Sequence, residues 1–259
     1  MSALIAAQLR ERRRSLLSWG VPLGVYSAFV VAIYPSIQGA LQKAIRGYPE
    51  GLKQAFGASE LSTVEDYLHV EMLSLIVPLA VGYLAVRSIA SGLSGAAESG
   101  RLDVLLSAPV SRRRLVAADF LATAVELAAV LAIAVLLALL GSLLSGAGLS
   151  FGSAAAGFGN VWPLALLSAG LGIVITGWSL RTSVVTGAVA GVLVGMYVLD
   201  LIGRLDKSLD AIRYASVFRY YGKASESGID PLSFLGVTAA AIALAATGAL
   251  LFDRRDLSD

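Results

Sequence analysis

Long apolar segments separated by short clusters of charged residues are the main pattern along this 259-residue chain. Each segment is close to the roughly 20 residues that an α-helix needs to cross a bilayer. The pattern therefore predicts an all-α, polytopic membrane protein with six transmembrane helices and short amphipathic interfacial helices. The expected spans cover residues 16–37, 72–93, 116–144, 161–180, 184–203 and 232–252.

The boundary between the third and fourth spans depends on small residues rather than on charges. From Leu127 to Leu180 the chain contains no Asp, Glu, Lys or Arg, which only a chain solvated mainly by lipid tolerates. The Gly- and Ser-rich stretch 141–159 is expected to break this region into two spans. A short turn around Arg181 then separates the fourth span from the fifth.

Arginine clusters orient the spans. They precede span one, connect spans two and three, and follow span six, so six spans place all three clusters on one side. The positive-inside rule makes that side cytoplasmic, with both termini inside. Residues 1–15 read either as an amphipathic pre-helix on the membrane surface or as a positively charged tail. Residues 16–259 then form a single membrane domain.

Two longer loops, 38–70 and 204–231, are expected on the outer side. In the first, Pro49 suits a first helical position and Ser62-Thr-Val-Glu65 fits a capping box leading into span two. The second predicts an interfacial helix, with Leu201, Leu205, Leu209 and Ile212 at helical spacing, and an aromatic belt of Tyr214, Phe218, Tyr220 and Tyr221. Both loops are expected to cap the bundle or a translocation path.

Composition excludes several classes of protein. The chain is 57% apolar and only 15% charged, whereas a soluble domain carries about a quarter charged residues. With no Cys and one His, neither a zinc site nor a disulfide framework is expected. The net charge of +2 does not indicate a nucleic-acid partner, and no P-loop motif occurs. We therefore expect no catalytic residue, no metal site and no cofactor bound by this chain itself, and the lipid bilayer as a partner.

Two intramembrane features carry structural hypotheses. Arg87 and Glu126 are expected at similar depth in adjacent helices, where they would form an ion pair that is either a static clamp or part of a polar path. Gly187, Gly191 and Gly195 form a double GxxxG pattern that suits close helix packing, within the bundle or between protomers.

The connection 96–115 is the most informative segment. It reads AAESGRLDVLLSAPVSRRRL, in which an acidic residue and Gly100 precede an apolar run and the sequence Ser107-Ala-Pro109-Val-Ser111-Arg112. This pattern resembles the signature of the ABC transporter type-2 permease family. The six spans, the basic start, Phe218–Tyr221 and the closing Phe252-Asp-Arg-Arg-Asp256-Leu add to the resemblance.

The resemblance implies an export permease subunit of a bacterial or archaeal cytoplasmic membrane. Such a chain works with two copies of a separate ATPase subunit, which bind ATP and Mg, and with a second permease chain that is identical or related. The segment would act as a coupling helix that docks in the ATPase subunit. The implied coupling residues are Glu98, Gly100, Leu102, Asp103, Leu105, Leu106, Pro109, Ser111 and Arg112.

Other interpretations remain open at this stage. The connection could be a plain basic loop that only sets topology. The chain could also be an ion- or proton-coupled secondary transporter that uses Arg87 and Glu126 with Asp119, or a structural membrane scaffold. The apolar spans are compatible with a drug-, lipid- or peptide-like substrate.

Overall fold

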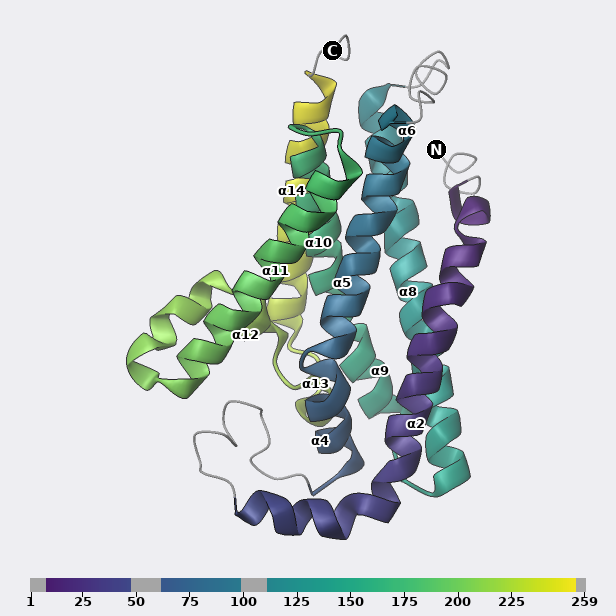
Figure 1. Ribbon diagram of the computed structural model, residues 1–259, viewed down its shortest axis with the longest axis vertical. Coiled ribbons are helices and arrows are strands. Elements are labelled where there is room, and N and C mark those ends of the chain that lie inside the picture. The colour runs from purple at the N-terminus through teal and green to yellow at the C-terminus, as the bar shows by residue number, and fades with distance from the viewer. Residues whose placement is uncertain (1–7, 48–61, 99–110, 255–259) are drawn as a thin grey trace.

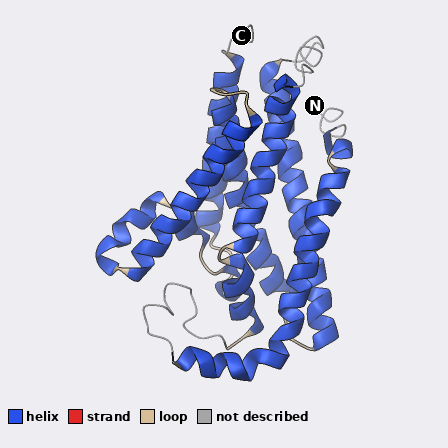
Figure 2. Ribbon diagram, viewed as in Figure 1, coloured by secondary structure: helices blue, strands red, loops and turns tan. Residues whose placement is uncertain are grey.

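The computed structural model describes residues 8–47, 62–98 and 111–254. Helices and short connections account for all of these residues, with no β-strand among them (Figure 2). The predicted all-α class is confirmed for this part of the chain. The long helices are α2 (Arg13–Arg46), α5 (Ile76–Ile89), α8 (Arg112–Ser145), α10 (Val161–Thr176), α11 (Thr182–Leu205) and α14 (Pro231–Asp253).

Shorter helical elements complete the fold. They are α4 (Val64–Leu68), the π-helix η1 (His69–Leu73), the π-helix η2 (Ala90–Ser94), α6 (Gly95–Glu98), α9 (Phe151–Gly159), the 3-10 helix η3 (Lys207–Ala215), α12 (Val217–Tyr221) and α13 (Ala224–Ser227).

Among the described residues, five helices are long and apolar enough to cross a membrane. A sixth span results if the pair Val64–Leu73 and Ile76–Gly92 is counted as one helix bent by 43°. The expected second span is therefore broken rather than straight. Pro78 lies in the first turn of α5 and has no N–H to donate to the preceding turn, which accounts for a bend at this place.

The Gly- and Ser-rich stretch 141–159 is mostly helical, so the expected break is much shorter than predicted. α8 continues to Ser145 and ends at Gly146, whose φ of +70° is the left-handed conformation that glycine adopts without strain. Ser150 then caps α9 by accepting a hydrogen bond from the backbone N–H of Ser153 (3.0 Å). Only Asn160 separates α9 from α10.

The charge-free region supplies the centre of the bundle. The candidate span Phe151–Thr176 contains α10, and 72% of its apolar 18-residue stretch is buried. The corresponding buried share is 22% for α11 and 17% for α14. α14 packs closely on α10. The two backbones are so close that a Cβ on Gly170 or Gly248 would clash with the backbone of the other helix. α11 and α14 therefore leave much apolar surface for lipid or for another protein.

α2 and α8 form a parallel pair (Figure 1). A Cβ on Gly20 or Gly24 would press on Ile133 or Leu137, and one on Gly141 would overlap the Ala28 backbone. The glycines thus let the two helices approach closely. Going along α2, each later residue meets a later residue of α8, so the two helices run in the same direction. The residues that precede α2 therefore lie beside the first half of α8.

Parts of the expected outer loops are helical. α2 extends to Arg46, and Figure 1 shows its last part crossing the end of the bundle. A capping box does open α4, but it pairs Thr63 with Asp66, one residue later than predicted. Pro49 lies outside the described residues.

In the second outer loop, the interfacial helix is a 3-10 helix followed by two short α-helices. The predicted aromatic belt is wrong for two of its four residues. Tyr214 and Tyr220 are exposed, whereas Phe218 and Tyr221 are buried. These two rings face inward because they pack in the core, Phe218 edge-on to Tyr197 and Tyr221 stacked on His69.

Candidate functional site at the basic end of the bundle

The starts of α2, α8 and α11 and the ends of α6 and α14 lie at one end of the bundle, which we call the basic end (Figure 1). Its arginines include Arg12–Arg14, Arg112–Arg114 and Arg181. The shared location of the arginine clusters agrees with the sequence expectation.

The basic end contains a buried ionic cluster around Arg12. Its guanidinium donates from Nη2 to Asp119 Oδ1 (2.5 Å) and from Nη1 to Glu126 Oε2 (2.9 Å). Nη1 also donates to the hydroxyl of Thr123 (2.7 Å). Ser88 on α5 donates its hydroxyl to the same Glu126 oxygen (2.8 Å). The cluster therefore joins three separate segments: the residues before α2, α5 and α8.

Local structure explains why Arg12 reaches this place. Its backbone N–H donates to the Gln8 carbonyl (3.0 Å), and Leu16 N–H donates to the Arg12 carbonyl (2.9 Å), so the residue sits in a continuous helical turn. The parallel register of α2 and α8 then places it against the part of α8 that lies about two to four turns after the start of that helix. Asp119 and Glu126 are seven residues apart, which puts them on the same face of a helix.

The expected Arg87–Glu126 ion pair is wrong: Glu126 is paired with Arg12. Arg87 is exposed on the outer face of α5, and none of the described ion pairs involves it. The next residue, Ser88, points to α8 instead and contacts Glu126. The sequence predicts Arg12 as a topology signal or as part of an amphipathic helix at the lipid headgroups, and not as the partner of Glu126. Its position one turn before an apolar span is the clue that the sequence offers.

Glu98, the last described residue before segment 99–110, contacts the start of α11. Its Oε1 accepts from the backbone N–H of Thr182 (2.9 Å), and its Oε2 accepts from the Thr182 hydroxyl (3.0 Å). A carboxylate at a helix N-terminus is stabilised by the unpaired N–H groups and the helix dipole. The predicted coupling residue is thus attached to a helix more than 80 residues away.

The residues that follow segment 99–110 contact α14. Ser111 is the N-cap residue of α8, and Arg112 is the first residue of that helix. The next residue, Arg113, donates from Nε to Asp253 Oδ2 at the end of α14 (2.9 Å). The remaining predicted coupling residues lie outside the described part of the chain: Gly100, Leu102, Asp103, Leu105, Leu106 and Pro109.

The predicted packing glycines of α11 face open space. A Cβ on Gly187, Gly191 or Gly195 would meet no atom within 4 Å. Of the two alternatives, packing within the described bundle is therefore not observed, whereas Gly20 and Gly24 of α2 do pack on α8.

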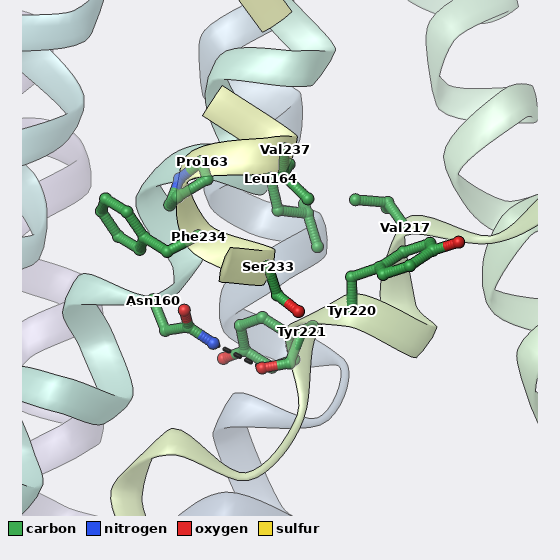
Figure 3. Close-up of a pocket in the computed structure, with 9 residues that line it drawn as sticks. All are labelled: Asn160, Pro163, Leu164, Val217, Tyr220, Tyr221, Ser233, Phe234 and Val237. Carbon is green, nitrogen blue, oxygen red and sulfur yellow. Dashed lines mark hydrogen bonds between the residues drawn. The ribbon is translucent and has the colours of Figure 1, made fainter. Parts of the chain in front are cut away.

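Two cavities lie away from the charged cluster. One has a volume of about 180 Å³ and lies between α5 and α11, lined by Leu79, Tyr83, Val86, Thr186, Ala190, Leu193 and Val194. The other, in Figure 3, has a volume of about 10 Å³, which holds at most one water. There the Asn160 side-chain amide donates to the Tyr221 carbonyl, which ties the start of α10 to α12.

The opposite end carries a second ionic cluster that sequence reasoning missed. Buried Asp200 of α11 accepts from Arg204 (2.5 Å) and from Arg213 (2.9 Å). Arg213 and Arg219 also contact Asp210 (2.8 and 3.2 Å). The hydrogen bond from Arg213 and the charge of Arg219 lower the pKa of the Asp210 carboxyl. This cluster fastens η3 against the end of α11.

The long apolar helices and the buried charges at one end define a multi-pass α-helical membrane protein rather than a soluble enzyme. The chain belongs to the family described as multidrug efflux system permease Rv1217c, C-terminal domain, whose model matches residues 1–253. A permease family indicates a transport subunit and not an enzyme. A search of curated proteins gives no match.

Proposed function

We propose that this chain is the membrane-spanning permease subunit of an ABC exporter. It assembles with two copies of a separate ATPase subunit, which bind ATP and Mg, and with a second permease chain, in a bacterial or archaeal cytoplasmic membrane. The family match supports an efflux permease. The basic end is then the cytoplasmic side, where the ATPase docks.

The observation that carries the proposal is the attachment of both borders of segment 99–110. Glu98 is bonded to α11 and Arg113 to α14, neither of which adjoins the segment in the sequence. A force applied to the segment would therefore reach two further helices directly. A loop that only sets topology needs no such contacts.

In this mechanism the apolar side chains Leu102, Leu105 and Leu106 enter a groove of the ATPase subunit. Pro109 turns the chain back toward α8, because the residue before a proline avoids helical geometry. When the ATPase subunits close on ATP, the segment pulls on α8 and α11 and changes access across the bundle.

The substrate route lies between the two permease chains, next to α11. α11 exposes Gly187, Gly191 and Gly195, which would allow a second helix to approach closely. The apolar cavity between α5 and α11 supports a substrate of drug- or lipid-like character.

Affinity purification of the tagged chain in mild detergent tests the proposal. An ATPase subunit should co-purify with the wild-type chain and be lost on Leu105→Asp or Pro109→Gly. Leu209→Asp is the matched control, because Leu209 lies in η3 at the opposite end. A chain without any ATPase partner that transports on an ion gradient would overturn the proposal in favour of a secondary transporter. A chain that shows neither ATP nor gradient dependence would indicate a scaffold.

A further inference from the structure

The Arg12 cluster contains one more carboxylate than it has positive charges. Asp119 and Glu126 are 1% and 0% exposed, and both share the single guanidinium of Arg12. An ionised carboxylate buried without full compensation is costly in a low-dielectric interior. With both acids ionised, the cluster holds one uncompensated negative charge.

The hydrogen-bond pattern shows the same deficit. Asp119 Oδ2 and Glu126 Oε1 are buried and have no donor among the described residues. The neighbouring hydroxyl groups cannot supply one: Thr123 donates to the Asp119 backbone carbonyl (2.9 Å), and Ser88 donates to Glu126 Oε2 (2.8 Å). Buried carboxylate oxygens normally find a partner.

Within residues 8–47, 62–98 and 111–254, no further charged group faces the cluster. On α5, Arg87 is exposed and points away. α10 carries no charged residue, and at this end of α14 the carboxylate of Asp253 is held by Arg113. Arg13 and Arg14, which follow Arg12, are both exposed.

The space beside Asp119 is too small for a metal ion or an ammonium group on the side of Gly92. A Cβ built on Gly92 would lie 2.7 Å from Asp119 Oδ2, so this oxygen rests directly on the backbone of η2. The described residues also contain no group of three or more acidic, His or Cys side chains that could hold a metal. A proton requires no additional volume.

We propose that the Arg12–Asp119–Glu126 cluster is a proton-binding site, in which one proton carried by the two carboxyl groups balances the charge that Arg12 leaves uncompensated. The proton resides on Asp119 Oδ2 or Glu126 Oε1, the two oxygens without a donor. Its binding is a simple protonation: a carboxylate takes one proton from the solvent, and no bond other than O–H forms.

Proton binding is linked to the position of the segment that carries Arg12. If this segment moves away from α8, the two carboxyl groups remain near each other without the guanidinium. Because two like charges at close range repel each other, binding of a proton by one of the carboxylates becomes more favourable. Linkage then requires that protonation in turn changes how strongly the segment docks. The inference does not depend on the proposed ATPase partner.

Infrared difference spectroscopy of the purified chain in phosphatidylcholine nanodiscs tests the inference directly. The carbonyl stretch of a protonated carboxylic acid should be present at neutral pH and disappear at alkaline pH. Asp119→Asn and Glu126→Gln should each abolish the band at neutral pH, because in either single variant the charge of the remaining carboxylate is balanced by Arg12. Arg12→Gln should strengthen the band and keep it to higher pH.

Asp230→Asn is the control, since Asp230 is an exposed helix cap and should leave the band unchanged. A wild-type spectrum without a titrating carboxylic acid band would overturn the inference, and so would a band that survives in both acid variants. If a variant fails to fold, a wild-type spectrum without the band still overturns the inference, and the other acid variant still assigns the band. As a second readout, the unfolding temperature of the wild-type chain should fall as the pH rises, and Glu126→Gln should flatten this dependence.

Discussion

Thr182 donates two hydrogen bonds to Glu98, one from its backbone amide and one from its hydroxyl, at 2.9 and 3.0 Å. The contact connects the end of α6 with the first residue of α11. It is exposed, so its direct contribution to stability is small, about 1 kcal/mol. In the proposed exporter its role is mechanical, because it attaches α11 next to segment 99–110.

Removing this contact should uncouple the permease without unfolding it. Glu98→Ala removes both hydrogen bonds, and Thr182→Val removes the one from the hydroxyl. Both variants are expected to lower the unfolding temperature only slightly, because about 1 kcal/mol or less is lost. Substrate export by the assembled transporter should fall more than its ATPase turnover. Thr247→Val is the control, since this exposed hydroxyl bonds only within α14. Equal loss of export and ATPase activity in both variants would contradict a coupling role.

Close packing of α2 on α8 predicts a steric effect at Gly141. A Cβ at this position would overlap the backbone of Ala28, and backbone atoms yield less readily than side chains. Gly141→Ala should therefore destabilise the chain by about 1–3 kcal/mol, as overpacking does. The measurement is thermal unfolding in detergent.

Gly236→Ala in α14 is the matched control for that effect, because a Cβ there meets nothing within 4 Å. In a helix it should be neutral or stabilise by up to about 1 kcal/mol, because alanine loses less backbone freedom than glycine. Equal destabilisation by both substitutions would show that the α2–α8 contact is not the cause.

The sequence predicted the helical class and most helix positions, because a lipid-facing helix must be apolar along its whole length. α14 begins and ends within one residue of the expected span, since Asp230 caps it and charges follow it. The bend at Ser74–Leu75 was missed, because a single proline in an apolar segment does not indicate whether the helix kinks or continues.

The partners of the buried charges were the hardest feature to predict. Arg87 was chosen for Glu126 by depth, but depth does not show which way a side chain faces around the helix. The true partner, Arg12, depends on the parallel register of α2 and α8, which small-residue contacts far from the charges determine. The Asp200–Arg213 contact similarly needs the fold of η3.

The ionic cluster at the opposite end predicts unequal effects of two aspartates. Asp200→Asn removes a buried carboxylate that forms ion pairs with Arg204 and Arg213. The free energy of unfolding should therefore fall by about 3 kcal/mol. Asp210→Asn should cost much less, because that side chain is 44% exposed and water screens its ion pairs. Chemical unfolding in detergent measures both. A larger effect at Asp210 would show that η3, rather than the end of α11, depends most on the cluster.

If two permease chains assemble as proposed, the exposed glycines of α11 predict where they pack. The chain has no cysteine, so a single introduced cysteine reports contacts cleanly. Gly191→Cys should give a disulfide-linked dimer in native membranes after mild oxidation, because glycine faces allow helices to approach within bonding distance. Leu136→Cys is the control: Leu136 is 64% exposed on α8, away from this face, and should stay monomeric. Cross-linking at 136 but not at 191 would place the contact on α8 instead.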